Sequence, residues 1–396
     1  MMALPLAPRP APRLSRRAAG LRSSVIRDLL KLTEREDVLS LAGGLPAPET
    51  FPMAELLAAA PDLLADAGSV QYSSTEGHAA LRAWIAERSG LGADPDRVVV
   101  THGSQQALDL VVRALCDPGD VVVIDSPGYL GALQVLEANE CAIVPVPVDD
   151  QGLDTDHLAT LLAAGLRPRL LATCPTFQNP TGVTMSPSRR LALAALADRY
   201  GFVVVEDDPY RALRWAGHDH PPIAASTEHG VWISTFSKTL APGLRLGWLV
   251  APAWLATAVT RLKQSADLHT STLTQRLAAG LVTQPGWFDA HVAGLVPLYR
   301  DRSRALAAAL RAELGDRIEL TEPDGGMFLW ARLPGVDTTA LLPAAVDGGV
   351  AYVPGTAFHT ADDPAAGHDT LRLSFATLPP AQLTEATRRL ATVVRR

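Results

Sequence analysis

The sequence predicts an α/β protein with a larger domain, whose mixed, mostly parallel seven-stranded sheet is covered by helices, and a smaller α+β domain. Two patterns lead to this prediction. Between residues 97 and 252, short β-branched runs alternate with helical patterns, as in a parallel sheet with helices on both faces. From about residue 299 onward, a long Ala/Leu/Arg-rich segment precedes spaced strand-like runs, which is typical of an α+β arrangement. A length of 396 residues also favours two domains.

Seven apolar runs are the predicted strands of the larger sheet. Most of them are continuously apolar, as expected for strands that are buried on both faces. The last two runs are too close together for a long helix between them, so we expect these two strands to pair antiparallel. The runs are residues 97–101, 121–125, 142–146, 170–174, 202–206, 231–235 and 245–250.

Capping residues predict the ends of one helix, and the sequence pattern predicts where the domains begin and end. The sequence predicts a helix with Ser186 as its N-cap and Pro187 in its first turn, and Gly201 is expected to end it. The smaller domain has strand-like runs at residues 326–331, 350–353 and 371–375, before a final helix that begins near Pro380. We expect four parts: a flexible tail (1–20), a helical arm that packs on the small domain (21–45), the large domain (46–295) and the small domain (296–396).

Composition and charge exclude several classes of protein. A hydrophobic fraction of 47% with 19% charged residues describes a globular chain. The net charge of −7 is modest and the basic residues are scattered, which argues against a nucleic-acid or membrane-surface partner. No apolar run approaches the roughly 20 residues that span a bilayer. The Pro- and Arg-rich start lacks the apolar stretch of a secretory signal, so we expect a soluble, cytoplasmic protein.

The three cysteines, Cys116, Cys141 and Cys174, show no metal-ligand spacing, and we expect no metal site. Their odd number argues against a disulfide framework. Each lies in or beside an apolar run, which indicates buried free thiols.

Lys238 is the first candidate catalytic residue. It follows an apolar strand on a turn rich in Ser and Thr. A lysine that forms a Schiff base needs partial desolvation and nearby positive charge, because both lower its pKa. Arg245 would supply that charge while binding a phosphate, and the hydroxyls of Thr235 and Ser237 are suitable phosphate donors. A lysine in a turn is, on its own, an ordinary surface residue, so the hypothesis depends on the other segments.

Polar and aromatic residues follow the other predicted strands, at the sheet edge where open α/β proteins bind ligands. Ser104 and Gln105 open a helix, where backbone N–H groups would bind an anion; an ordinary glycine turn with a serine cap is the alternative. Tyr129 follows a Pro-Gly pair. Its ring would stack on a flat cofactor or simply pack against the protein.

Three further segments suggest the rest of a site. Asn179 lies in an Asn-Pro-Thr-Gly turn and offers a donor to a phenolate oxygen. The acidic run 206–208 ends a buried strand, and its charges would repel one another unless a cation lay nearby. A protonated ring nitrogen beside Asp207 would be that cation; a solvated acidic loop is the alternative. Arg372 lies within an apolar strand, where it needs a partner, either a substrate carboxylate or an internal acid.

Five segments together carry a family resemblance: residues 43–52, 71–77, 101–108, 177–182 and 206–210. They resemble the class I/II aminotransferases of pyridoxal 5'-phosphate (PLP) fold type I, and in particular the 2-aminoadipate and MocR-related branch. The resemblance covers nearly the whole chain. Thr235 stands where Ser is common in the family, which preserves the hydroxyl.

The resemblance implies PLP as the cofactor and assigns a role to each candidate residue. Lys238 would form the Schiff base and transfer the substrate proton, and Asp207 would pair with the pyridine nitrogen. Asn179 and Tyr210 would contact the phenolate oxygen, with Tyr129 stacked on the ring. The implied phosphate ligands are Ser104, Gln105, Thr235, Ser237 and Arg245, joined by Tyr72 from the second subunit of a homodimer.

The implied substrate contacts are fewer. Arg372 would bind the α-carboxylate, with the backbone of Gly44 and the side chain of Asn179 close to it. Arg27 matches a position that recognises an acidic substrate side chain in this branch; the alternative is a helix-surface arginine beside Asp28.

The implied activity is ping-pong transfer of an amino group between an L-amino acid and a 2-oxo acid, with glutamate and 2-oxoglutarate as one pair. A different PLP reaction on the same fold, such as that of a β-lyase, decarboxylase or oxidase, stays open. A non-catalytic, MocR-like PLP-sensing module is the second alternative. Such regulators carry a DNA-binding domain in front, and the 42 residues before Gly43 are too few for one.

Overall fold

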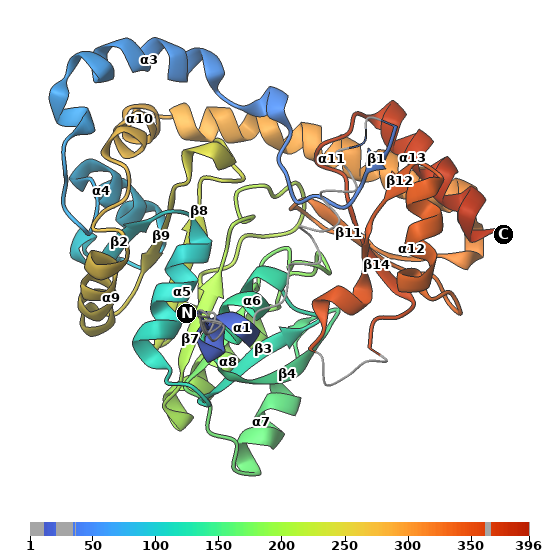
Figure 1. Ribbon diagram of the computed structural model, residues 1–396, viewed down its shortest axis with the longest axis horizontal. Helices are drawn as coiled ribbons and strands as arrows, with labels where there is room; N and C mark the ends of the chain where they lie inside the picture. Colours follow the sequence, from blue (N-terminus) through green and yellow to red (C-terminus); the bar gives the residue numbers. More distant parts are fainter. Residues whose placement is uncertain (1–11, 21–34, 36, 361–365, 396) are drawn as a thin grey trace, which may run out of the picture.

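The computed structural model describes residues 12–20, 35, 37–360 and 366–395. Its larger sheet has eight strands in the order β2-β9-β8-β7-β6-β3-β4-β5. Figure 1 labels β2, β9, β8, β7, β3 and β4 of this sheet. The strands are β2 (Val98–Thr101), β3 (Val121–Ser126), β4 (Ala142–Asp149), β5 (Gly152–Leu153), β6 (Leu170–Thr173), β7 (Val203–Asp207), β8 (Gly230–Thr235) and β9 (Gly247–Val250).

All seven predicted strands occur in this sheet. Strands β4, β3, β6, β7 and β8 are parallel neighbours, whereas β9 is antiparallel to both β8 and β2. The antiparallel pairing of the last two strands is therefore confirmed. The predicted number of strands is corrected from seven to eight, because β5 is a two-residue strand that pairs back onto β4 and is too short to give a periodic signal.

Helices cover both faces of the larger sheet, which explains its continuously apolar strands. In β7, Val203 and Val205 pack in one apolar cluster while Val204 packs in another on the opposite face. Three helices cover the first face: α5 (Ser104–Leu115), α6 (Leu130–Ala138) and α9 (Ala253–Ala266). Four cover the second: α4 (Ala79–Arg88), α7 (Thr155–Ala163), α8 (Pro187–Tyr200) and α10 (Thr272–Val282).

The boundaries of α8 confirm the local reading of the sequence. Ser186 is its N-cap, Pro187 is its first residue, and Gly201 ends it with a φ of 73°. That backbone conformation favours glycine.

The smaller sheet has four antiparallel strands in the order β10-β11-β14-β13. They are β10 (Glu319–Thr321), β11 (Phe328–Arg332), β13 (Val353–Pro354) and β14 (Thr370–Ser374). The three predicted runs all form strands here or beside it, and the last helix, α13 (Pro380–Val394), begins where expected. The short β10 is a strand that the sequence reading missed.

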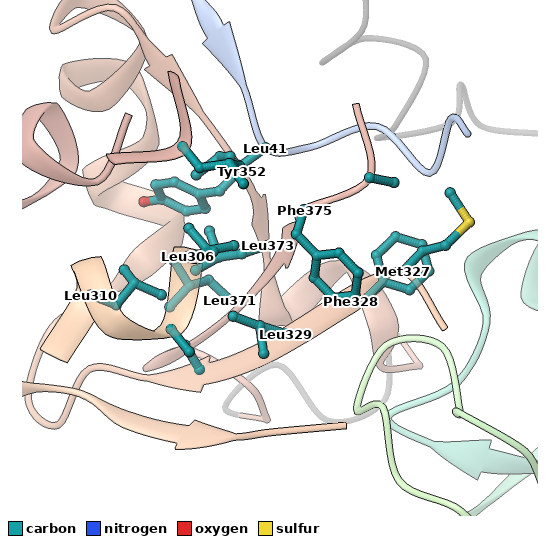
Figure 2. Close-up of a cluster of buried hydrophobic side chains, with 14 of the residues drawn as sticks. Leu41, Leu306, Leu310, Met327, Phe328, Leu329, Tyr352, Leu371, Leu373 and Phe375 are labelled. Atoms are coloured by element: carbon teal, nitrogen blue, oxygen red, sulfur yellow. The ribbon is translucent and has the colours of Figure 1, made fainter. Parts of the chain in front are cut away.

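The core beneath the smaller sheet combines segments that are far apart in the chain. Figure 2 shows Leu306 and Leu310 of α11 (Trp287–Leu314) close to Leu371 and Leu373 of β14. Leu41, from the N-terminal segment, lies in the same core. The remaining elements of this region are α12 (Thr338–Asp347), β12 (Val350–Ala351) and its parallel partner β1 (Leu39–Ser40).

The predicted domain boundary at residues 295 and 296 and the predicted N-terminal arm remain predictions. The expected boundary between residues 295 and 296 falls inside α11, which runs without a break from 287 to 314. Residues 21–34 and 36 of the predicted helical arm lie outside the described residues, and so does Arg27. Two helices complete the described N-terminal region, α1 (Arg16–Gly20) and α3 (Met53–Ala65).

Candidate active site

A cavity of about 260 Å³ lies where the carboxyl ends of the parallel strands face the smaller sheet. All but two of the predicted site residues line this cavity. The twelve that do are Gly44, Ser104, Gln105, Tyr129, Asn179, Asp207, Tyr210, Thr235, Ser237, Lys238, Arg245 and Arg372. The chain therefore brings together, from two sheets, residues that are up to 328 positions apart.

Lys238 lies at the centre of the site, just after β8. Its Nζ donates a hydrogen bond to the carbonyl oxygen of Gly44 at 2.7 Å. Burial lowers the pKa of Lys238 to about 8, and the positive charges of Arg372 and Arg245 act in the same direction, while Asp207 opposes them. Both conditions for a reactive lysine, desolvation and nearby positive charge, are therefore present.

Asp207 is the last residue of β7 and lines the same cavity. Burial raises its pKa to about 7, the negative charge of Asp208 adds to this effect, and Lys238 opposes it. Its Oδ1 is buried without a hydrogen-bond partner. A buried carboxylate oxygen needs a donor or a cation, and a protonated ring nitrogen in the cavity would supply both.

The acidic neighbours of Asp207 face the opposite side of the sheet, since successive side chains of a strand alternate. Glu206 forms an ion pair with Arg190 at 3.1 Å, and Asp208 accepts a hydrogen bond from Trp232 Nε1 at 3.1 Å. The expectation that one cation balances all three acids is therefore corrected. Only Asp207 faces the cavity, and the other two have protein partners.

Arg372 is 1% exposed and lies on β14. Its Nη1 donates to Asn179 Oδ1 at 2.8 Å and its Nη2 donates to the carbonyl oxygen of Ala42 at 2.7 Å, whereas Nε has no partner. The guanidinium carbon lies 4.1 Å from the ring centre of Phe328 and 5.0 Å from that of Phe358. Burial lowers its pKa to about 10.

No Asp or Glu in the described part of the chain forms an ion pair with Arg372. The internal-acid alternative therefore finds no support there, and a carboxylate from a ligand would complete its hydrogen bonding.

Asn179 and Tyr210 lie beside Arg372. Asn179 Nδ2 donates to the Tyr210 hydroxyl at 3.4 Å, and burial raises the pKa of that hydroxyl well above its usual value. Tyr129 is held by Gln105, whose Oε1 accepts from the Tyr129 hydroxyl at 3.4 Å. Side chains that can donate to an oxygen and a ring that can stack thus lie on the walls of one cavity.

The start of α5, which also lines the cavity, suits an anion. Ser104 and Gln105 are the first residues of α5, whose opening N–H groups have no partner within the helix. Gly103, just before them, has a φ of 82°, and a Cβ there would lie 2.7 Å from Arg245 Nη2. Arg245 Nη2 itself donates to the carbonyl oxygen of His102 at 3.0 Å. Glycine suits this position, because its φ is positive and a Cβ there would push the Arg245 guanidinium away from the helix start.

Two predicted residues do not line the cavity. Tyr72 is 77% exposed, and its ring makes an edge contact with His269; its predicted role needs a second subunit. Arg27 lies outside the described residues.

The sequence reading also missed residues that line the cavity or flank Arg372. Phe328 lines the cavity and contacts Arg372, and the Phe358 ring also lies against that guanidinium, with its centre 5.0 Å from the guanidinium carbon. Cys174 lines the cavity as a buried free thiol, whereas Cys116 and Cys141 are only partly buried, so the expectation of three buried thiols is corrected. Phe358 gave no signal in the sequence, since it lies in a short helical turn (Gly355–Phe358) outside the predicted strands.

In the described part of the chain, no helix combines the length and apolarity that crossing a membrane requires.

Comparison with known proteins identifies the family. Residues 36–390 match the family model for aminotransferases of class I and II. The chain is 42% identical to aromatic-amino-acid aminotransferase 1 of Thermococcus litoralis, over 96% of this chain and 94% of that protein. It is 41% identical to 2-aminoadipate transaminase of Thermus thermophilus, over 94% of both chains.

Solved structures agree with this assignment. The α-aminoadipate aminotransferase of Thermus thermophilus, complexed with N-(5'-phosphopyridoxyl)-L-leucine, superposes with a TM-score of 0.89 at 38% identity and covers 96% of this chain and 97% of its own. A kynurenine aminotransferase of Pyrococcus horikoshii gives a TM-score of 0.90 at 38% identity, with 96% of each chain covered.

The fold is therefore that of the PLP enzymes of fold type I. The chain belongs to the class I and II aminotransferases, and it is a PLP-dependent transaminase. The cavity fits this cofactor, because it offers an anion site at one end, a lysine with a lowered pKa, and a buried carboxylate oxygen without a partner.

Proposed function

We propose that this enzyme transfers an amino group between an L-amino acid and a 2-oxo acid in two half-reactions with ping-pong kinetics, and that glutamate and 2-oxoglutarate form one pair. One observation carries the proposal: the buried Arg372 guanidinium, which lacks a carboxylate partner among the described residues, shares a cavity with Lys238. An α-carboxylate on Arg372 would place the neighbouring amine and Cα of an amino acid within the cavity that Lys238 lines.

Lys238 and Asp207 carry the proton chemistry in this proposal. When bound, PLP supplies an aldehyde for the amino group and a ring that withdraws electrons from Cα. Lys238 Nζ, whose pKa is lowered to about 8, would accept the proton from the substrate Cα as a general base. Asp207 holds a proton on the ring nitrogen through its carboxylate. Asn179 and Tyr210 would donate hydrogen bonds to the phenolate oxygen of the cofactor.

The remaining residues bind and orient. Arg372 would bind the α-carboxylate with the N–H groups that Asn179 and the Ala42 carbonyl do not engage, among them Nε, which has no partner. Gly44 lies beside it, where a Cβ would come 3.1 Å from the Phe328 ring, so the backbone can approach the substrate. The proposed phosphate ligands are the N–H groups of Ser104 and Gln105, the Ser237 hydroxyl and Arg245. The Thr235 hydroxyl, also predicted as a ligand, donates to the Leu246 carbonyl at 2.7 Å and lies 2.9 Å from the Ser237 hydroxyl, so it would position Ser237.

A second copy of the chain completes the proposed phosphate site. Helix α3 has no buried residue, and Met53, Leu57 and Leu64 on it are 52%, 67% and 62% exposed. Apolar side chains gathered on one exposed helix mark an interaction surface. Tyr72, 77% exposed, follows α3 closely in the chain. A homodimer would cover α3 and carry Tyr72 to the phosphate site of the partner.

Three further assignments are part of this proposal. Arg27 would recognise an acidic side chain, in keeping with the 2-aminoadipate named for one relative. The chain would act in the cytoplasm, and it would divide into the tail, arm, large domain and small domain given above.

A single-turnover experiment tests the reaction. Purified holoenzyme is mixed with L-glutamate alone, and products are identified by mass spectrometry. We expect one equivalent each of 2-oxoglutarate and pyridoxamine phosphate, and neither from Lys238→Ala. Release of carbon dioxide would instead identify a decarboxylase. Release of ammonia without pyridoxamine phosphate would identify a lyase or an oxidase. If glutamate fails but another amino acid gives its 2-oxo acid, only the glutamate assignment is wrong.

A further inference from the structure

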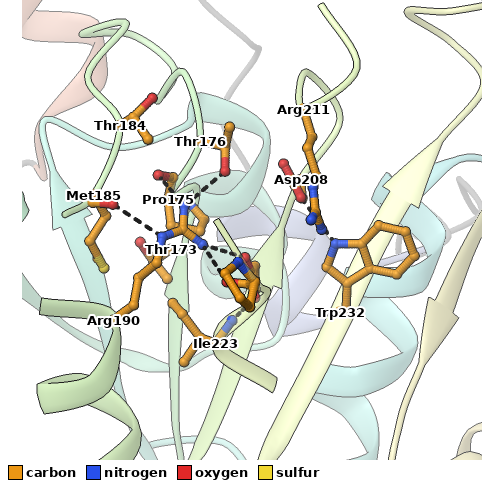
Figure 3. Close-up of polar contacts among 12 residues, drawn as sticks. Thr173, Pro175, Thr176, Thr184, Met185, Arg190, Asp208, Arg211, Ile223 and Trp232 are labelled. Carbon is orange, nitrogen blue, oxygen red and sulfur yellow. Dashed lines mark hydrogen bonds and ion pairs between the residues drawn. The ribbon is translucent and has the colours of Figure 1, made fainter. Parts of the chain in front are cut away.

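A buried arginine on α8 closes the base of the loop that carries Asn179, residues 175–185. Arg190 is 4% exposed. Its Nη2 donates to the carbonyl oxygen of Pro175 at 2.8 Å, and its Nε donates to that of Met185 at 3.1 Å. Met185 N also donates to the Pro175 carbonyl at 2.7 Å. Figure 3 shows the guanidinium between these two ends of the loop.

The same guanidinium reaches the strand that carries Asp207. Arg190 Nη1 donates to Glu206 Oε1 at 3.1 Å, and Glu206, which is 1% exposed, directly precedes Asp207 on β7. The second oxygen of Glu206 accepts from Ile223 N at 2.7 Å. Arg190 Nη2 makes a further bond to Thr176 Oγ1 at 2.9 Å. One planar group thus joins the Asn179 loop to β7.

Hydrogen bonds inside the loop continue this connection to Asn179. Gln178 N donates to Val183 O at 2.8 Å, and Gly182 N donates to Gln178 O at 2.6 Å. The loop therefore has little freedom once its base is fixed. Asn179 then meets Arg372 at 2.8 Å.

We propose that Arg190 is a positioning residue of the active site, which fixes Asn179 relative to Asp207 across the cofactor cavity. This inference rests on the proposed roles of those two residues. In this proposal, Arg190 contacts neither the substrate nor the cofactor. The planar fork of arginine is essential, because lysine keeps the charge opposite Glu206 but cannot bond Pro175, Met185 and Glu206 in one plane.

Arg190→Lys is the main test, assayed as holoenzyme at a temperature where circular dichroism shows the variant folded. A misplacement of about 1 Å costs up to roughly 100-fold in rate. We expect kcat for transamination to fall at least about tenfold. We also expect the pH at which the visible absorption of the bound cofactor changes to shift, in the same direction as in Asn179→Ala, since Asn179 is the group displaced.

The neighbouring residue provides a matched control. Arg189 also lies in the first turn of α8 and forms an ion pair, with Asp149, but it makes no contact with the Asn179 loop among its described bonds. Arg189→Lys should leave kcat and the absorption titration unchanged. A double variant, Arg190→Met with Glu206→Gln, removes the buried charges together and so avoids an unpaired carboxylate; it should fold and show the same loss of kcat.

The outcomes separate this inference from the proposed function. If Arg190→Lys kept the wild-type kcat and absorption titration and only its melting temperature fell, Arg190 would have a purely structural role. That result would overturn this inference but not the proposed function. If Asn179→Ala also kept full activity, the proposed roles of the site residues would be wrong as well. Reduced kcat and a shifted titration in both Arg190 variants, with Arg189→Lys unchanged, support the inference.

Discussion

At the scale of single residues, the site is organised by buried charges that lack ordinary partners. Arg372 has no described carboxylate partner, Asp207 has an oxygen without a hydrogen bond, and Lys238 has a pKa lowered to about 8. Each of these states costs free energy in the folded protein. In the proposed function, these groups prepare the cavity for a zwitterionic substrate and a cofactor with a cationic ring.

Replacing Arg372 by lysine should weaken substrate binding. Lysine keeps a positive charge but loses the bidentate geometry, and one lost charged hydrogen bond is worth roughly 1.5–3 kcal/mol. We therefore expect the Kd of the amino acid in the half-reaction to rise roughly 10- to 100-fold, as measured by stopped-flow absorption. Arg332→Lys, on the paired strand β11 where Arg332 is solvent-exposed and bonds Asp369, is the control. Unchanged binding in the Arg372 variant would remove this residue from the substrate site.

The rate at which the apoenzyme binds PLP should depend on the pKa of Lys238. Only the neutral amine attacks an aldehyde. With a folded-state pKa lowered to about 8, the neutral fraction rises about tenfold between pH 7 and pH 9 and then levels off. Stopped-flow absorption of apoenzyme mixed with PLP measures this rate. An increase that continues through pH 10 without levelling would show an ordinary exposed lysine instead.

At the scale of elements, the ends of strands and helices decide which side chains meet. The sequence reading predicted the convergence of Asn179, Asp207 and Lys238, because parallel strands must present their carboxyl ends at one edge. It could not assign the neighbours of Asp207 to the other face, since its predicted strand ended at residue 206 and Asp207 belongs to β7. Arg190 was also missed, because a helix pattern does not show which buried strand its first turn will contact.

A side chain at position 103 should disturb the anion site at the start of α5. Gly103→Ala places a Cβ 2.7 Å from Arg245 Nη2 at a φ of 82°, which displaces Arg245 from the anion site. We expect the Kd for PLP to rise roughly tenfold or more, as for one lost charged hydrogen bond. Gly119→Ala controls for backbone strain, because Gly119 has a φ of 92° with nothing within 4 Å of its Cβ position. An equal rise in the Kd for PLP in both variants would show that backbone strain, and not displacement of Arg245, causes the weaker binding.

At the scale of the whole molecule, the sequence indicated most of the architecture and the structure supplied the contacts between distant parts. The strands of the large sheet follow from their apolar runs, whereas β5 and β10 are two or three residues long and leave no period to detect. The position of Leu41 in the core of the small sheet depends on how the N-terminal segment crosses the molecule. Local patterns contain no information about that path, so only the folded chain shows it.

Self-association through α3 is the prediction that concerns the molecule as a whole. Leu57 and Leu64 are 67% and 62% exposed, so replacing both with glutamate should leave the fold of each chain intact. Two charges buried in an apolar interface would oppose its formation, and we expect sedimentation velocity to show a shift from dimer toward monomer. Affinity for PLP should fall in parallel, because Tyr72 then no longer reaches the partner. Leu191→Glu, at a leucine that is 60% exposed on α8, should change neither property. A double variant that sediments like the wild type would place the subunit interface elsewhere, while a monomer with undiminished PLP affinity would show that Tyr72 does not serve the phosphate site.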